Sequence, residues 1–268
     1  MNIKLSLIIS FYNKIERLKW VFVALERQTF KEFEVVIADD GSNAQVVEQL
    51  KDMIAAASFP VKHIWHEDSG WQKNKILNAA VNVAVAPLLV FIDGDCVPTR
   101  RFLEDHYSVA KRGEVSTGRR VMLTDAITKS ISEDKINSGY LESCTIFWQL
   151  LYETIFCGRK TKMEQMFRVK PAWLRKIFVK EKSRFILGCN YSIYKEDLLK
   201  VKGFDERFVN PGYGEDIDLG NRLERYSDVK LMSRKRLMII YHTYHEHFFM
   251  DTPENLALLE ENKLKPNF

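Results

Sequence analysis

Hydrophobic residues in the first hundred positions alternate between short continuous runs and one-sided stripes. The continuous runs predict buried strands over residues 3–10, 33–38, 61–66 and 88–92. The stripes recur at helical spacing and predict helices over residues 15–28, 44–57 and 72–85. Strands that alternate with helices in this way predict an α/β fold with right-handed crossovers and a mainly parallel central sheet.

The pattern becomes less regular after residue 98. It predicts a helix over 99–111, a strand over 114–123, a long helical segment over 131–182, a strand over 185–194, a helix over 215–225 and a strand over 237–241. No repeat and no Gly/Ser-rich linker divides the chain. We therefore expect one domain over residues 1–268. Its first half is 1–98, its second half is 99–124 with 183–268, and 125–182 is a helical insertion.

Two carboxylates follow the most apolar run of the chain, residues 88–92. Asp93 and Asp95 are separated only by Gly94. A strand buried on both faces rarely carries acids, so we expect the pair just past its C-terminal end, where open α/β sheets bind ligands. Two oxygen ligands at this spacing suit a hard cation that also contacts phosphate. An Asp-Gly turn that merely ends the strand is the structural alternative.

Three further polar loops are expected at the same edge of the sheet. They are Ser10-Phe11-Tyr12-Asn13, Asp39-Asp40-Gly41-Ser42 and the segment 68–75, which carries Lys73 and Lys75. An ionised carboxylate such as Asp40 accepts hydrogen bonds from ribose hydroxyls or a base edge. Lysines beside a helix start suit an anion. A capped turn and a solvated helix start are the alternatives for the second and third loops.

Two later motifs carry acids and imidazoles. Gly212-Tyr213-Gly214 leads directly into Glu215 and Asp216, at a predicted helix start where acids also stabilise the helix itself. After the last predicted strand, His242 and His245 are spaced to reach one cation, such as manganese or zinc. Simple helix capping and a histidine-rich surface loop are the alternatives.

Composition and charge narrow the class of protein. The formal net charge of +4 is too small to indicate nucleic-acid binding, and we expect no nucleic-acid partner. Ten Lys or Arg residues nevertheless lie within 159–184, against Glu164 and Glu181. The four cysteines have no metal-finger spacing and are expected to be reduced, mostly as packing residues. We see no signal peptide and no run of about 18 apolar residues, and so expect a cytoplasmic protein that does not span a membrane.

The ordered set of motifs at 10–13, 39–42, 93–95 and 214–216 resembles glycosyltransferase family 2, of the GT-A fold. The C-terminal part looks like the ending of β-1,4-galactosyltransferases and chondroitin-polymerising enzymes. This second likeness rests on Gly188-Cys189-Asn190-Tyr191-Ser192, Gly203-Phe204-Asp205-Glu206, residues 212–218 and His242-Thr243-Tyr244-His245. Together the resembling stretches cover nearly the whole chain except about 125–182.

The resemblance implies a metal site for Mn2+ or Mg2+. Asp93-Gly94-Asp95 corresponds to the DxD motif of the family, with Asp95 as a direct metal ligand and Asp93 near the metal or the donor ribose. His242 and His245 are implied to complete the metal sphere.

The resemblance also implies a pocket for the nucleotide sugar. Asp40 is implied to hold the uracil and ribose, in a pocket framed by Ser10 and Tyr12. Relatives usually carry Arg-Asn in the third helix, where this chain has Leu77-Asn78. Lys73 and Lys75 are the candidates to supply the missing charge to the diphosphate.

On the acceptor side, the resemblance implies that Asp216 is the general base that deprotonates an acceptor hydroxyl. Tyr213, Gly214 and Glu215 are implied to help place the acceptor and donor sugars. Such an inverting transfer requires a base and a metal that neutralises the departing diphosphate, and no covalent enzyme nucleophile.

Together, these implied roles describe an enzyme that transfers a hexose or N-acetylhexosamine from a UDP-sugar to a glycan or lipid-linked acceptor. We expect such a reaction in the synthesis of a cell-surface polysaccharide or lipopolysaccharide. A nucleotidyltransferase acting on sugar phosphates is one alternative, although that class usually carries a glycine-rich basic loop after its first strand. A non-catalytic module that binds a nucleotide sugar or a membrane is the other.

The segment 146–182 mixes tryptophan and aliphatic residues with cations. This composition suits an interfacial helix on an anionic membrane. We therefore expect peripheral contact at the cytoplasmic face of the inner membrane. A helical insertion that covers the acceptor site, with its charges solvated, is the alternative.

Overall fold

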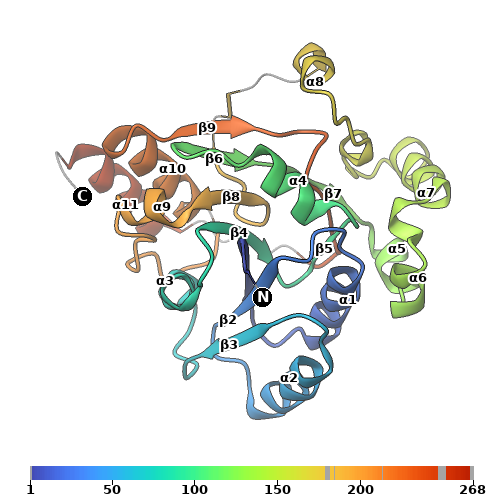
Figure 1. Cartoon of the computed structure of the whole chain (residues 1–268), viewed down its shortest axis with the longest axis horizontal. Helices are drawn as coiled ribbons and strands as arrows, with labels where there is room; N and C mark the ends of the chain where they lie inside the picture. Colours follow the sequence, from blue (N-terminus) through green and yellow to red (C-terminus); the bar gives the residue numbers. More distant parts are fainter. Residues whose placement is uncertain (1, 179–181, 184, 213, 247–251, 266–268) are drawn as a thin grey trace.

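The computed structural model describes residues 2–178, 182–183, 185–212, 214–246 and 252–265. A seven-stranded sheet runs through the molecule in the order β3-β2-β1-β4-β8-β6-β9 (Figure 1). Its strands are β1 (Leu5–Phe11), β2 (Phe33–Asp39), β3 (Val61–Trp65), β4 (Leu88–Asp93), β6 (Glu114–Thr117), β8 (Tyr191–Tyr194) and β9 (Lys230–Ser233). All pairs are parallel except those of β8 with β4 and β6. The predicted α/β fold with a mainly parallel sheet is confirmed.

Helices cover both faces of this sheet because its central strands are apolar on both sides. On one face, Leu7 and Ile9 of β1 pack in a core with α1 (Ile15–Glu26), α2 (Ala44–Ala56) and α4 (Phe102–Val109). On the other face, Ile8 packs in a core with α3 (Lys73–Val83), α9 (Lys195–Leu199) and α10 (Glu215–Tyr226). Successive residues of one strand thus serve opposite cores. The last helix, α11 (Pro253–Leu264), packs against α10.

A second, three-stranded sheet has the order β5-β10-β7, with β5 (Cys96–Pro98), β7 (Arg119–Met122) and β10 (Ile239–His242). The single strand predicted over 114–123 is wrong, because Gly118 divides it between the two sheets. A Cβ at Gly118 would lie 2.4 Å from the side-chain nitrogen of Asn190, so only glycine permits this close approach. The division places β7 beside β10 and both beside the Asp93–Asp95 turn.

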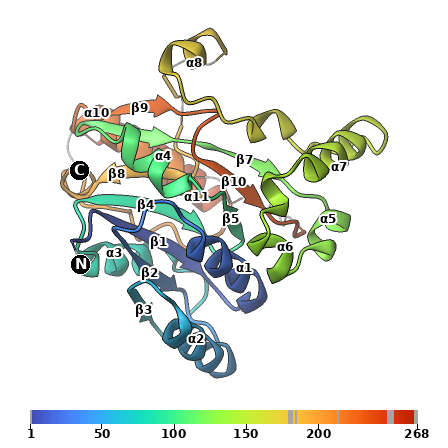
Figure 2. The ribbon, with the colours of Figure 1, turned by 45° about the vertical axis from the view of Figure 1, so that its right-hand side comes forward.

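The segment between β7 and β8 is not one long helix as predicted. It consists of α5 (Asp125–Ser130), α6 (Glu133–Asn137), η1 (Tyr140–Glu142), α7 (Cys144–Ile155), η2 (Met163–Met166) and α8 (Ala172–Phe178). Left-handed residues at Gly139 and Lys162 interrupt the helical path. Figure 2 shows α5, α6 and α7 grouped beside the small sheet, where Ile146 and Leu150 join a third core with Tyr241 of β10.

Other boundaries also differ from the predictions. The strand predicted over 185–194 starts only at Tyr191, because residues 188–190 form a turn that is part of the candidate site. The short elements β5, β9 and α9 were not predicted, and neither was the longer helix α11, whose apolar residues form no strong one-sided stripe. Among the described residues, no helix has the length and apolar character needed to cross a bilayer.

Candidate active site

The C-terminal ends of β1, β2 and β4 meet at one edge of the large sheet. Asp93 is the last residue of β4 rather than a residue beyond it, which corrects the prediction. Its neighbour in register on β1 is Ser10, whose hydroxyl donates to Asp93 Oδ1 at 2.7 Å. The ammonium of Lys73, at the start of α3, donates to the same oxygen at 3.2 Å. Burial raises the pKa of Asp93, but the charge of Lys73 and the hydrogen bonds from Ser10 and Lys73 together hold that pKa below the ordinary range.

Asp95 lies opposite two imidazoles from the chain that follows β10. Its Oδ2 is 3.6 Å from Nε2 of His242 and 3.2 Å from Nε2 of His245. Ligand atoms of the three residues lie within 4.8 Å of one another. The backbone N–H of Thr243 donates to the Asp95 carbonyl at 3.1 Å and ties the two segments together. One carboxylate and two imidazoles form a donor set that suits Mn2+.

The protonation states of Asp95 and His242 agree with a metal site. Burial raises the pKa of Asp95, but the hydrogen bond from His245 and the two imidazoles bring it down to about 2. Burial lowers the pKa of His242 to about 4, so its ring is neutral at pH 7, as a metal ligand must be. Hydrogen bonding to Asp95 raises the pKa of His245. The residues therefore fit a divalent cation.

Gly94 makes this arrangement possible. Its N–H donates to the Ser10 carbonyl at 2.8 Å, and a Cβ would lie 3.2 Å from both that oxygen and the Phe11 ring. The turn between the two acids therefore packs directly on the end of β1.

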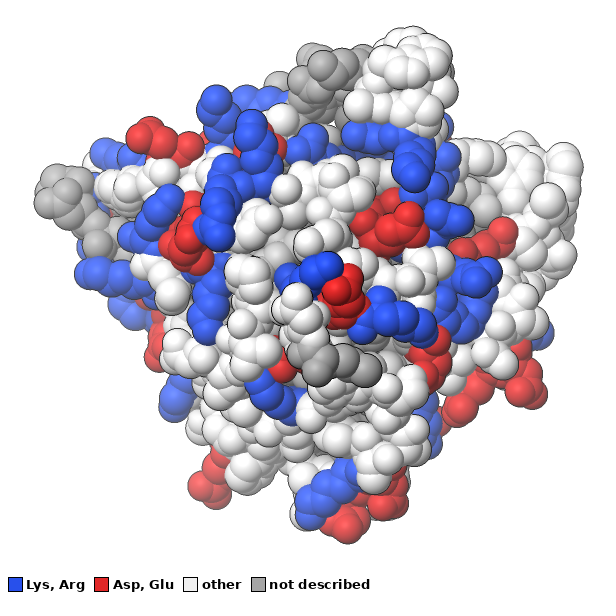
Figure 3. All heavy atoms as spheres, viewed as in Figure 1, with Lys and Arg blue, Asp and Glu red and all other residues white. Residues whose placement is uncertain are grey.

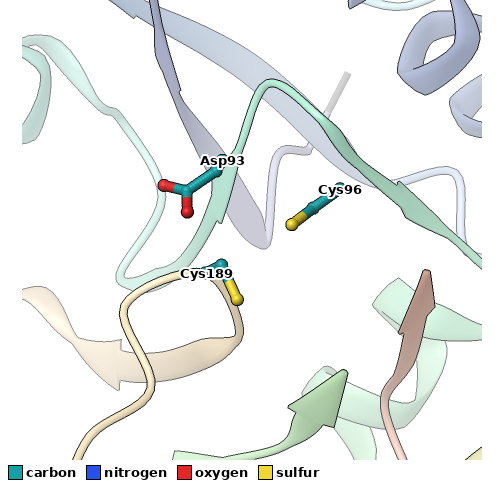
Figure 4. Close-up of side chains that lie close together, drawn as sticks. All are labelled: Asp93, Cys96 and Cys189. Carbon is teal, nitrogen blue, oxygen red and sulfur yellow. The ribbon is translucent and has the colours of Figure 1, made fainter. Parts of the chain in front are cut away.

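A second cluster joins Asp93 to Cys96 and Cys189, with ligand atoms within 4.8 Å (Figure 4). Both thiols are buried, as expected for packing residues, whereas Cys144 and Cys157 are exposed. Figure 4 shows the Asp93 carboxylate pointing away from the two sulfur atoms. Thiolates are soft ligands, and Asp93 is already hydrogen-bonded to Ser10 and Lys73. The Asp95 cluster is therefore the better fit for Mn2+ or Mg2+.

A pocket of about 260 Å3 opens beside these acids, at the ends of β1 and β2. Its lining includes Ser10, Tyr12, Asp40, Asp68, Trp71 and Lys73. Asp40 accepts hydrogen bonds from His66 at 2.8 Å and from the N–H of Gln72 at 3.0 Å. Burial raises its pKa. The Tyr12 hydroxyl donates to Asp68 at 2.9 Å, so the exposed Tyr12 ring forms one wall of the pocket.

Lys75 is not brought to this site. It is exposed, and its ammonium donates to the side chain of Gln72 at 3.2 Å. Of the two lysines named from the sequence, only Lys73 reaches the carboxylates.

The second pair of acids begins α10 on the other side of Lys73. The N–H of Gly188 donates to Asp216 Oδ2 at 2.8 Å. A Cβ on Gly188 would stand 2.5 Å from that oxygen, so the backbone can approach only because the residue is glycine. A narrow pocket lies between Lys73, Asp93 and the two acids Glu215 and Asp216.

These two acids differ electrostatically from Asp93 and Asp95. Burial, followed by the charge of Asp216, raises the pKa of Glu215 to about 7. Burial also raises the pKa of Asp216. Glu215 Oε2 is buried and has no hydrogen-bond partner. Gly214, with φ of 144°, begins the helix against Phe208, and Tyr213 lies outside the described residues.

Two arginines near the site were not singled out from the sequence. Arg17 of α1 donates to the Tyr244 carbonyl at 3.3 Å, and its Nη1 is buried without a hydrogen-bond partner. Arg120 of β7 donates to Cys189 Sγ at 3.5 Å. The one available signal was the pair of adjacent cations Arg119-Arg120 inside the predicted strand 114–123.

Comparisons with known proteins show the family and the fold of the chain. The sequence profile of "Glycosyl transferase family 2" matches residues 6–182, and that of "N-terminal domain of galactosyltransferase" matches residues 172–246. Validoxylamine A glucosyltransferase of Streptomyces hygroscopicus subsp. jinggangensis (strain 5008) is 25% identical over 248 residues, which cover 86% of this chain and 54% of that protein. Chondroitin synthase of Pasteurella multocida (strain Pm70) is 27% identical over 234 residues, covering 83% of this chain and 23% of that protein.

Among solved structures, GalNAc-T7 with UDP, GalNAc and Mn2+ superimposes with a TM-score of 0.64 at 14% identity. The match covers 97% of this chain and 47% of GalNAc-T7, and at this identity it shows the fold alone. The chain spans about half the length of the first of these curated relatives and less than a quarter of the second. Because the first profile covers well over half of the residues, the chain belongs to glycosyltransferase family 2, and its fold is GT-A.

Proposed function

We propose that the chain is an inverting, metal-dependent glycosyltransferase that moves a hexose or N-acetylhexosamine from a UDP-sugar to a glycan or lipid-linked acceptor. The observation that carries this proposal is the meeting of two unlike acid pairs around Lys73. Asp93 is held ionised beside Lys73, whereas Glu215 and Asp216 on its other side have raised pKa values. The pair Asp93 and Asp95 is suited to bind a metal cation, and the pair Glu215 and Asp216 is suited to accept a proton.

On the donor side, the pocket with Ser10, Tyr12 and Asp40 takes the nucleoside. Asp95, His242 and His245, with Asp93 behind them, hold Mn2+ or Mg2+. When bound, the metal neutralises negative charge on the departing diphosphate. Lys73 supplies a further positive charge between the diphosphate and the acceptor side.

On the acceptor side, Asp216 is the general base. Its Oδ2 is held by the N–H of Gly188, which leaves Oδ1 to take the proton of the acceptor hydroxyl. The acceptor oxygen bonds to the anomeric carbon as the bond from that carbon to the diphosphate breaks, and the configuration inverts. Tyr213, Gly214 and Glu215 help to place the acceptor.

Two features favour this reaction over nucleotidyl transfer and over a non-catalytic module. The segment Ser10-Phe11-Tyr12-Asn13, at the end of β1, contains no glycine to wrap a triphosphate. Burying Glu215 and Asp216 beside each other raises their pKa values, and this lowers the stability of the fold at neutral pH. A module that only binds a ligand does not need such a destabilising pair.

The donor assignment is tested by a hydrolysis and binding screen. UDP-galactose, UDP-glucose and their N-acetylated forms are each incubated with Mn2+ and, separately, with a chelator. We expect one of them to be bound and slowly hydrolysed only when the metal is present. If none is bound or turned over, the proposal fails.

We also propose that α7 and α8 contact an anionic membrane at the cytoplasmic face of the inner membrane. Trp148 and Phe156, at α7, are 63% and 74% exposed, and Trp173 of α8 is 68% exposed. Figure 3 shows a largely uncharged surface over α7, with Lys and Arg gathered next to it below α8. Exposed aromatic residues beside cations suit such a surface. A lipid-linked acceptor for a surface polysaccharide or lipopolysaccharide would be reached there.

Vesicle sedimentation tests the membrane contact. The protein is expected to pellet with phosphatidylglycerol vesicles and to remain in solution with phosphatidylcholine vesicles. Trp148→Ser combined with Phe156→Ser is expected to abolish pelleting, whereas Val85→Ser, which removes an exposed apolar residue elsewhere, leaves it intact. Equal behaviour of both variants contradicts this contact.

A further inference from the structure

Three cations from two distant segments come together beside the acceptor side of the site. Arg119 and Arg120 begin β7, and Lys162 precedes η2. The N–H of Met122 donates to the Thr161 carbonyl at 2.7 Å, which holds the Lys162 segment against β7. Lys162 has a left-handed backbone with φ of 54°, which a lysine adopts only when its surroundings impose it.

The charges of Asp93 and Glu164 reach Arg120 and Lys162, but neither acid is in ion-pair contact with them. Within the described residues, no carboxylate forms an ion pair with any of the three. Arg119 donates to the Gly118 carbonyl and stacks 5.0 Å from the Phe185 ring, and Arg120 donates to the sulfur of Cys189. Arg120 Nε is buried without a hydrogen-bond partner. Arg119 and Arg120 are partly buried, whereas Lys162 is exposed. Buried guanidinium groups without an ion pair are costly unless an anion joins them.

The three charges also affect one another. Burial lowers the pKa of Lys162, and the guanidinium groups of Arg120 and Arg119 lower it further. This repulsion shows that the three charges lie within electrostatic reach of one another, so an anion near them would lower the repulsion. Guanidinium groups in particular match the paired oxygens of phosphate and carboxylate.

The three cations lie between Asp216 and a surface groove beside Thr161. Cys189, which Arg120 contacts, follows Gly188, whose N–H holds Asp216. On the other side, Lys162 follows Thr161, which lines a groove of about 660 Å3 together with Met122 and Tyr244. None of the three cations lines the nucleoside pocket.

We propose that Arg119, Arg120 and Lys162 form an anion-binding subsite for a phosphate or carboxylate group of the acceptor. The subsite fixes an acidic acceptor so that its hydroxyl reaches Asp216. This inference rests on the proposed function, because it takes the Asp216 side as the acceptor side. The donor diphosphate is a poorer occupant, since Lys73 and the metal ligands already face it.

Calorimetric titration with three matched probes tests the subsite directly. The probes are methyl β-D-glucoside, methyl β-D-glucuronide and methyl β-D-glucoside 6-phosphate, each added to protein with UDP and Mn2+. At least one charged probe is expected to bind about 10-fold or more tightly than the neutral glucoside, as charged hydrogen bonds allow. The tighter charged probe identifies the group. Equal affinity for all three overturns the proposal.

Arg119→Gln combined with Lys162→Gln is expected to remove the preference for the charged probe. Lys51→Gln, an exposed lysine on α2, is the matched control and keeps it. A retained preference in the double variant also overturns the subsite.

Hydrolysis of the UDP-sugar without acceptor separates this proposal from the reaction itself. The double variant is expected to keep the wild-type KM for the UDP-sugar. A raised KM assigns the cations to the donor diphosphate and overturns the acceptor subsite. Absence of hydrolysis in every protein, with probe preference intact, overturns the proposed function and leaves the subsite standing.

Discussion

The donor half of the site, around Asp93 and Asp95, and the acceptor half, around Glu215 and Asp216, each bring carboxylates to Lys73. The two environments shift the pKa values of these acids in opposite directions. In the donor half, Asp95 faces two imidazoles and its pKa falls to about 2. In the acceptor half, Glu215 is buried beside Asp216 and its pKa rises to about 7. The same functional group thus acts as a fixed anion in one half and as a proton carrier in the other. The neighbours of an acid, rather than its type, assign its role.

The acids of the two halves are also positioned by different kinds of contact. Asp93 is positioned by the register of adjacent parallel strands, which aligns it with Ser10. Asp216 depends on one backbone contact with Gly188, a residue 28 positions away in the sequence. We therefore expect changes around the acids to be tolerated better in the donor half than in the acceptor half.

The largest effect is expected from Asp95→Asn, which removes the charged metal ligand. We expect turnover of the UDP-sugar to fall by about 1000-fold at a fixed Mn2+ concentration, since metal stabilisation of leaving-group charge supplies several kcal/mol. Steady-state kinetics over a range of Mn2+ concentrations measure the loss. Asp52→Asn on α2 is the control. Wild-type turnover in Asp95→Asn would remove Asp95 from the metal site.

Gly188→Ala should have the next largest effect, confined to the acceptor half. The new Cβ would displace Asp216, and we expect transfer to fall about 10- to 100-fold while UDP affinity stays unchanged. Gly220→Ala on α10 is the matched control, since its Cβ would meet only side-chain atoms at 3.3 Å or more. Equal losses in both variants would mean that fold disruption, and not the position of Asp216, is responsible.

The pH dependence of transfer sharpens the electrostatic comparison. Burial raises the pKa of both Glu215 and Asp216, so the pair keeps a proton at acidic pH and the base is lost as pH falls. We expect the rate at saturating substrates to drop about tenfold for each pH unit below the raised pKa of Asp216. A rate that stays constant between about pH 5 and 8 would contradict the raised pKa values.

The smallest effect is expected outside both halves, on α7. Trp148 is exposed, so Trp148→Ser should change the free energy of unfolding by less than about 0.5 kcal/mol. Leu150 on the same helix is fully buried, and Leu150→Ala should cost about 2–5 kcal/mol. Denaturant titration of the two variants measures both values. A large loss in Trp148→Ser would mean that this face packs against protein rather than presenting itself to a membrane.

Much of the donor half could be predicted because its signals are local. The runs around Ile8 and Val90 are long and apolar, and the strands they predict differ from the observed ones by only a few residues. The polar residues that follow these strands necessarily meet at one edge, because the strands are parallel. That geometry brings Ser10 to Asp93 without any information from the rest of the chain.

The acceptor half could be predicted only in part, because long-range contacts define it. The switch of the chain between sheets at Gly118 is set by contact with Asn190, and nothing in the local pattern reveals that contact. Likewise, the pairing of β10 with β5 and β7 joins strands that are far apart in sequence. Lys75 was predicted to be at the site because it is close to Lys73 in the sequence. Its side chain instead points to Gln72 and away from the acids.

The division of roles between the two acid pairs is tested most directly by titrating UDP, in the presence of Mn2+, into three proteins. The wild type and Asp216→Asn are expected to bind UDP with equal affinity, although Asp216→Asn transfers no sugar. Asp95→Asn is expected to lose most of the affinity that depends on Mn2+. Loss of UDP binding in Asp216→Asn, or full Mn2+-dependent binding in Asp95→Asn, would contradict the account.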